Sequence, residues 1–223
     1  MTVIILEEST SIDLTRSRVL EPRHVTKARE LFCKSRVPIA PSAGAKPKEF
    51  RGGQENAPIN CKFCNRPQDT VKTLPLRLSH PIFGRFHDDC ETSKPTHQDK
   101  TFIYRFVEAM SKLYDTEKDR QTVVLDLFRT VGIAMQPSEI IGTEYTTDGS
   151  IFRQGSFLYV LAELKNEISS TNCEPYLQAA LYYLEATRRS APDYRNSGLP
   201  CIILLIFGMF TGTYSMYTHV NCV

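Results

Sequence analysis

Residues 157–165 constrain the fold more than any other segment of the chain. The first six of them are apolar, aromatic or β-branched, and the segment ends in Glu163, Leu164 and Lys165. A short run of this kind predicts a buried β-strand. Because side chains two positions apart share one face of a strand, we expect Glu163 and Lys165 to point the same way and Leu164 to point oppositely.

Helical patterns flank this strand on both sides. Apolar residues recur at helical spacing after Thr96, and Gly132 is a typical helix stop. Proline is well tolerated in the first turn of a helix, so Glu174-Pro175 predicts a helix start. The predicted elements are helices at 22–36, 102–114 and 116–131, strands at 139–145 and 157–165, a helix at 175–189 and a strand at 201–207. This order predicts an α/β (α+β) fold with a mixed central sheet flanked by helices and a helical N-terminal part.

Composition divides the chain into three parts. With 223 residues and 41% hydrophobic content, the chain can form one domain plus an extension. Residues 37–60 are rich in Pro, Gly and Ala, which is typical of a linker. We therefore expect 1–60 to be a partly disordered arm and linker, 61–95 to be an extension that packs on the core, and 96–223 to be the α/β domain.

Charge and hydropathy limit the classes of function. The formal net charge is +2, and residues 61–223 carry seventeen Lys and Arg against eighteen Asp and Glu, which argues against strongly steered binding to a polyanion. The first residues lack a basic region and a long apolar run, so we expect no secretory signal. Residues 201–210 are apolar, but this is about half the length of a membrane-spanning helix. Seven scattered cysteines suit reduced thiols. We expect an intracellular protein, in the cytoplasm or the nucleus, with no membrane partner.

Four segments carry a resemblance to a known family. They are Leu78-Ser-His-Pro-Ile-Phe-Gly-Arg-Phe-His-Asp-Asp-Cys90, Glu144-Tyr-Thr-Thr-Asp-Gly149, Glu163-Leu-Lys-Asn-Glu-Ile168 and Glu174-Pro-Tyr-Leu-Gln-Ala-Ala-Leu-Tyr-Tyr183. On these segments the chain resembles the PD-(D/E)xK nuclease-like domain of fungal Crinkler-type proteins, which is often joined to a kinase-like domain. The resemblance implies a restriction-endonuclease-like core. We see no kinase signature, so we expect the kinase part to be absent, and the last elements of the fold are candidates for truncation.

The resemblance also implies a site for metal-dependent phosphodiester hydrolysis of nucleic acid. Asp148 and Glu163 would bind Mg²⁺, and the carbonyl of Leu164 would be a further ligand. Lys165 would orient or deprotonate the attacking water and offset phosphate charge. Hydrolysis needs charge neutralisation on the phosphate and a deprotonated water, and Mg²⁺ held by carboxylates supplies both.

Two polar residues of the predicted helix at 175–189 extend this site. Gln178 and Tyr182 are four positions apart, so they share one helix face, where they would bind a substrate phosphate or brace the acidic residues. Glu144 and Glu167 are further acids that the site can recruit.

Simpler interpretations stand beside this one. Asp148-Gly149 is also typical of a hairpin turn, and Glu163 and Lys165 are also typical of a weak surface ion pair. A further interpretation is an interaction or regulatory module that has the same fold but no catalytic activity. The sequence does not identify the protein partners of such a module.

A third function class rests on Cys61, Cys64, His87 and Cys90. Their pattern is C-x2-C followed by H-x2-C, and thiolate and imidazole are the ligands that tetrahedral zinc prefers. The two pairs are far apart in sequence, so we rank a zinc-stabilised binding domain below the other two classes.

Overall fold

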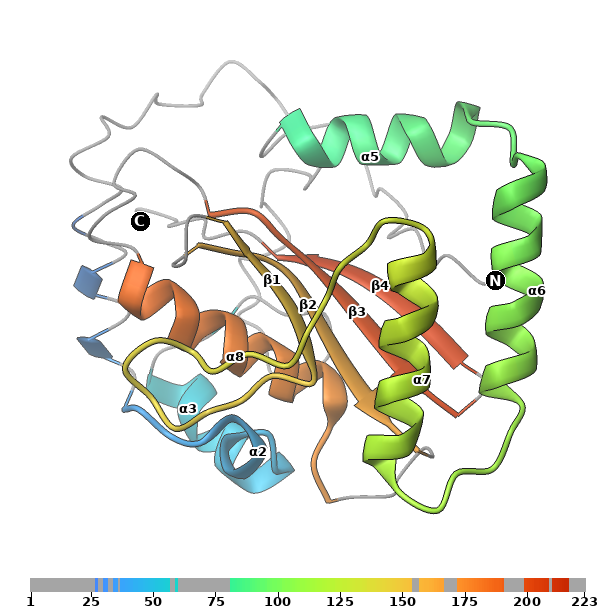
Figure 1. Cartoon of the computed structure of the whole chain (residues 1–223). Coiled ribbons are helices and arrows are strands. Elements are labelled where there is room, and N and C mark those ends of the chain that lie inside the picture. The colour runs from blue at the N-terminus through green and yellow to red at the C-terminus, as the bar shows by residue number, and fades with distance from the viewer. Residues whose placement is uncertain are drawn as a thin grey trace.

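A four-stranded mixed sheet lies at the centre of the computed structural model (Figure 1). The structure describes residues 27, 30, 31, 34, 35, 37–56, 59, 81–153, 157–166, 172–190, 199–208 and 210–216. The strands are β1 (Gly149–Arg153), β2 (Phe157–Lys165), β3 (Cys201–Phe207) and β4 (Phe210–Met216), in the order β1-β2-β3-β4. The inner pair β2 and β3 is parallel, and both outer pairs are antiparallel. The predicted mixed sheet with flanking helices is therefore confirmed.

Helices cover both faces of this sheet. Helix α8 (Pro175–Ser190) connects β2 to the parallel strand β3 and packs on one face, where Leu161 of β2 joins its hydrophobic cluster. Helices α6 (His97–Met110) and α7 (Glu117–Thr130) pack on the other face, against Ala162 and Leu164. The alternation expected along β2 is thus observed, and it places Glu163 and Lys165 on the α8 face.

The sequence explains where these helices begin. Thr96 and Asp99 form a capping box at the start of α6, and the Thr116 hydroxyl accepts a hydrogen bond from the Asp119 backbone N–H at the start of α7. Each cap satisfies an N–H group that has no partner within the helix. The predicted helices at 116–131 and 175–189 and the predicted strands at 157–165 and 201–207 are confirmed.

Several predicted segments differ in the structure, and the helix predicted at 102–114 runs from His97 to Met110. Residues 139–145 form a turn instead of a strand, because Ile140 and Tyr145 are joined by a backbone hydrogen bond and Gly142 has a φ of 71°. Only the single bridge between Glu139 and Thr146 is strand-like there. Strand β4 was not predicted from the sequence, and only a short connection separates it from β3.

The segment predicted to be a linker forms two helices instead. Helices α2 (Pro41–Gly44) and α3 (Pro47–Asn56) lie beside α8 (Figure 1), and Ala45 and Phe50 are buried in one hydrophobic cluster with Leu177 and Leu181 of α8. Proline suits the first turn of each helix, and the small residues of α2 allow a close approach to α8. The low apolar content of residues 37–60 predicted a linker. The two helices nevertheless pack on α8, because this contact needs only a few apolar residues.

The more N-terminal helix predicted at 22–36 is helical at the five positions there that the structure describes. Helix α5 (Pro81–Thr92) falls in the predicted extension and is mostly exposed, although Phe83 is buried. Within the described part of the chain, no helix is long and apolar enough to cross a membrane.

We predict opposite effects on stability for alanine substitutions at Gly44, which lies against α8, and at Gly52, where the space for a Cβ is open. A Cβ added at Gly44 would lie 2.7 Å from Ile39 Cγ2 and 2.8 Å from Leu181 Cδ1, whereas a Cβ at Gly52 has no such neighbour within 4 Å. Gly44→Ala should lower the free energy of unfolding by roughly 1–3 kcal/mol through overpacking. Gly52→Ala should raise it by about 0.5–1 kcal/mol, because alanine favours a helix interior. Urea unfolding measures both, and a neutral Gly44→Ala would contradict the close contact.

Candidate active site

The site is centred on the C-terminal end of β2. The Glu163 side chain is 0% exposed, and Lys165 is 6% exposed. Glu163 Oε1 lies 2.9 Å from Lys165 Nζ. This ion pair is close, yet neither Glu163 oxygen makes a well-aligned hydrogen bond with the residues described. A buried carboxylate with so little compensation is costly to the fold, which points to a functional reason for keeping it.

Asp148 lies against the same end of β2. Gly149 pairs with Ala162 in the antiparallel ladder, so Asp148 directly precedes β1 and does not form the two-residue hairpin turn that was the alternative. Its Oδ2 accepts a hydrogen bond of 2.8 Å from the Leu164 N–H and lies 3.9 Å from Lys165 Nζ. The Gln121 side chain of α7 donates to the Asp148 carbonyl and fixes the backbone there.

A third carboxylate, Glu117, was missed by the sequence interpretation. It is the first residue of α7, and its Oε1 lies 3.2 Å from Lys165 Nζ. An acidic residue in a first helical turn is ordinary, because it favours the positive end of the helix dipole. The sequence therefore held no signal that distinguished Glu117 from a capping acid, and only the tertiary fold brings it to Lys165.

The charges of this cluster shift the pKa values of its members. Burial, followed by the charge of Asp148, raises the pKa of Glu163 well above its ordinary value. Burial also raises the pKa of Asp148. Burial by itself lowers the pKa of Lys165, but the charges of Glu163, Asp148 and Glu117 outweigh it, so the pKa of Lys165 is raised. Lys165 is therefore an ammonium group, and three carboxyl groups surround it.

Tyr182 braces the segment that carries Asp148. Its hydroxyl donates a 2.8 Å hydrogen bond to the carbonyl of Thr146, two residues before Asp148. Burial and the charge of Glu163 raise the pKa of Tyr182 to about 12, so the hydroxyl keeps its proton. Of the two roles expected for Tyr182, this contact favours bracing over direct binding of phosphate.

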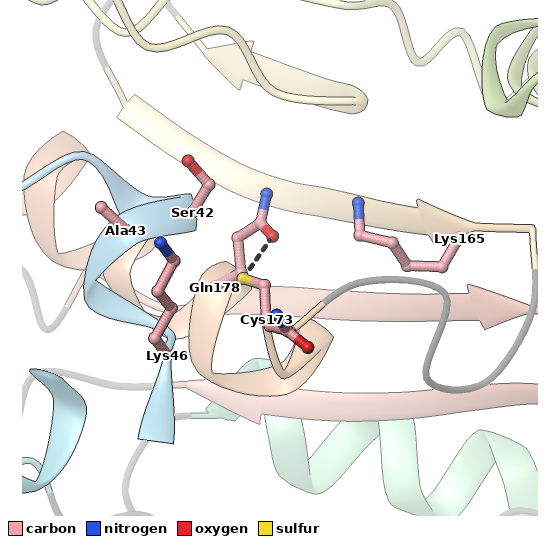
Figure 2. Close-up of a pocket in the computed structure, with 7 residues that line it drawn as sticks. Ser42, Ala43, Lys46, Lys165, Cys173 and Gln178 are labelled. Carbon is pink, nitrogen blue, oxygen red and sulfur yellow. Dashed lines mark hydrogen bonds between the residues drawn. The ribbon is translucent and has the colours of Figure 1, made fainter. Parts of the chain in front are cut away.

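Gln178 lies one turn earlier on α8 and faces a cavity. Its side-chain carbonyl accepts a 3.0 Å hydrogen bond from the Cys173 thiol (Figure 2). The cavity, of about 440 Å³, opens beside Lys165. It is lined by Ser42, Ala43, Lys46, Lys165, Asn172, Cys173 and Gln178. The candidate site therefore has an adjoining space that a substrate can enter.

The remaining expected residues stay apart from the cluster or lie outside the described residues. Glu144 is exposed in the turn before β1. Glu167 lies outside the described residues, as do Cys61 and Cys64 of the expected zinc pattern. His87 and Cys90 are both on α5, where His87 lies 3.6 Å from Glu91 and Cys90 is exposed with a free thiol.

The donor set suits a hard divalent cation. Carboxylate and carbonyl oxygens are the ligands that Mg²⁺ prefers, and Mg²⁺ usually keeps several waters. Glu163 Oε1 contacts Lys165 Nζ, which leaves Oε2, and Asp148 retains Oδ1, since the Leu164 N–H engages only Oδ2. Among the described residues, no three His, Cys, Asp or Glu side chains are arranged to hold a metal ion, so a cation here would depend on two carboxylates, the expected Leu164 carbonyl and water.

Comparisons of the chain with protein-family models, with curated proteins and with solved structures found no match.

Proposed function

We propose that the chain is a metal-dependent nuclease with a PD-(D/E)xK-type site on a restriction-endonuclease-like core. One observation carries the proposal: the buried Glu163 and the adjacent Asp148 converge on Lys165 at the end of a parallel strand, beside an open cavity. A structural ion pair joins one carboxyl group to one ammonium group, whereas here three carboxyl groups surround the single ammonium group of Lys165. This excess favours a site that binds a cation.

Each residue has a distinct role in this proposal. Asp148 and Glu163 would hold Mg²⁺, with the Leu164 carbonyl as a further donor, and the ion would offset phosphate charge and lower the pKa of water. Lys165, as an ammonium group, orients the attacking water and stabilises the negative charge that develops on the phosphate. It does not serve as the base. Tyr182 keeps the Asp148 segment in place through Thr146.

Glu117 supports the site by positioning Lys165. Its carboxylate is the most exposed of the three, with 40% of the side chain accessible, and it contacts Lys165 Nζ from the start of α7. Glu117→Gln should therefore weaken cleavage less than Glu163→Gln does.

Cleavage assays test the proposal. Single- and double-stranded DNA and RNA are incubated with the protein and Mg²⁺ or Mn²⁺, with chelator as the metal-free control. The wild type should cleave only with metal, and Lys165→Ala should lose roughly 10²–10³-fold of the rate, as expected for removal of one preorganised electrostatic group. Glu163→Ala should be inactive.

A matched control separates chemistry from folding. Glu185 is also buried, at 4% exposure, but it lies on α8 and pairs with Arg188. Glu185→Gln should keep metal-dependent cleavage when assayed where it is folded. If the folded wild type cleaves none of the substrates, or if Glu163→Ala retains wild-type cleavage, the nuclease proposal fails and the silent interaction module becomes the better account.

A further inference from the structure

The cavity beside Lys165 has a wall that does not belong to the α/β core. Ser42 and Ala43 lie on α2, and Lys46 lies in the short connection between α2 and α3. Figure 2 shows these residues on one side of the cavity, with Gln178 and Cys173 between them and Lys165. The backbone N–H of Glu174 donates to the Ala45 carbonyl at 3.4 Å, which ties this wall to the start of α8. The N-terminal segment is thus part of the site.

Lys46 differs from Lys165 in its electrostatic surroundings. Lys165 is already surrounded by three carboxylates, whereas Lys46 is exposed and has no ion pair with any carboxylate of the described residues. Burial and the charge of Glu163 raise the pKa of Cys173 to about 11, and both Lys165 and Lys46 oppose that rise. Both ammonium groups therefore act on the same part of the cavity, and Lys46 is the one available to an incoming anion.

The other lining groups suit a nucleotide. Ser42 supplies a hydroxyl, and Asn172 and Gln178 supply amides, which are neutral partners for phosphate and sugar oxygens. A volume of about 440 Å³ lies in the range of pockets that hold small ligands, roughly 300–1,000 Å³. A cavity of this size matches one nucleotide unit of a flexible strand.

We propose that Lys46, with Ser42, binds the phosphate next to the scissile phosphate of a single-stranded nucleic acid. This inference rests on the proposed nuclease function and adds a substrate class to it. Lysine binds phosphate as a point charge, and a lysine without a carboxylate partner gives up no ion pair when it does so. The segment that carries Ser42 and Lys46 thereby selects a single strand, in preference to a duplex, as the nucleic acid that reaches Lys165.

Binding measurements test this assignment without requiring catalysis. Fluorescence anisotropy is recorded for labelled dT6, rU6 and a 12-base-pair duplex in Ca²⁺, at several salt concentrations. Lys46→Ala should raise the Kd for the single strands roughly tenfold, the effect of one charged hydrogen bond, and should reduce the slope of log K against log salt by about 0.7, the value of one phosphate contact on a single strand.

Two variants serve as controls for Lys46→Ala. Lys46→Arg keeps the charge and should stay within about twofold of wild type. Lys48 is exposed on α3 and does not line the cavity, so Lys48→Ala should also stay within about twofold. All three substitutions are at exposed positions and should leave the melting temperature unchanged, which thermal unfolding verifies.

The outcomes separate this inference from the nuclease proposal. Lys46→Ala could lose affinity and salt slope while wild type shows no cleavage. This result would support the phosphate contact and overturn the nuclease proposal. Metal-dependent cleavage with an unchanged Kd and slope in Lys46→Ala would overturn the phosphate contact alone. Duplex binding that depends on Lys46 as strongly as single-strand binding would overturn the assignment to single strands.

Discussion

Lys165→Ala is expected to lose roughly 3–5 kcal/mol of stability in the absence of divalent metal, the cost of leaving a buried charge uncompensated. Lys165 lies within 4.0 Å of Glu163, Asp148 and Glu117, and its side chain is only 8% exposed. Without the ammonium group, the carboxylates repel one another in a poorly solvated place. Urea unfolding in chelator measures the loss.

Divalent metal should restore much of this stability. Because a bound cation replaces the missing positive charge, Mg²⁺ or Mn²⁺ should raise the melting temperature of Lys165→Ala more than that of wild type. The loss of stability in Lys165→Ala should also become smaller toward acidic pH, because protonated carboxyl groups do not repel one another. Lys112 pairs with Glu108 at 3.7 Å on the surface, so Lys112→Ala should cost less than about 1 kcal/mol and show no such rescue. A Lys165→Ala protein that is as stable as wild type in chelator would contradict the account.

Glu163→Gln is expected to have the opposite effect on stability while abolishing metal binding. The buried carboxylate has no well-aligned hydrogen bond among the described residues, and its pKa is raised well above 4.5 by burial and by Asp148. Replacing a poorly compensated buried charge with a neutral amide of the same shape should increase the free energy of unfolding by on the order of 1–3 kcal/mol at neutral pH. In this variant the carboxyl groups of Asp148 and Glu117 remain to balance the positive charge of Lys165.

The pH dependence of this gain follows from the sign of the shift. The folded protein binds the Glu163 proton more tightly than the unfolded chain does, so wild type loses stability as pH rises from the ordinary value of 4.5 through the raised pKa. The advantage of Glu163→Gln should therefore be absent below about pH 4 and full above the raised pKa. Thermal unfolding of wild type and Glu163→Gln at a series of pH values measures this advantage.

Glu185→Gln is the matched control for this prediction. Glu185 is buried like Glu163, but both of its carboxylate oxygens accept hydrogen bonds from Arg188, at 3.0 and 3.1 Å. Its replacement should lower stability, because Arg188 loses a charged partner. A Glu163→Gln protein that is destabilised as much as Glu185→Gln would show that Glu163 is a structural residue.

Strong local patterns allowed most of the core to be predicted. The apolar run at 157–165 gave β2 and the face shared by Glu163 and Lys165, and Thr116 and Pro175 gave the starts of α7 and α8. The segment at 139–145 misled because its apolar residues Ile140 and Ile141 are interrupted by Gly142, which forms a turn. The edge strand β4 was missed because its glycine and threonine residues are common in turns as well.

The candidate site was only partly predictable, for a different reason. Asp148, Glu163 and Lys165 lie close together in sequence, and an antiparallel pair of strands brings them together. Glu117 and Lys46 reach the site from segments whose local sequences have ordinary structural explanations, a helix N-terminus and a Pro/Ala-rich segment. Their places depend on how α7 and α2 pack on the sheet and on α8, which no local pattern encodes.

Calorimetric titration of Mn²⁺ into wild type, Glu163→Gln and Glu185→Gln tests the central claim most directly, because it measures the cation site without requiring a substrate. Wild type and Glu185→Gln should bind the ion with the same stoichiometry, and binding to Glu163→Gln should be lost, since the main buried ligand is gone. Binding of Mn²⁺ to Glu163→Gln with wild-type affinity, or no binding to the folded wild type, would contradict the assignment of this carboxylate cluster as a metal site.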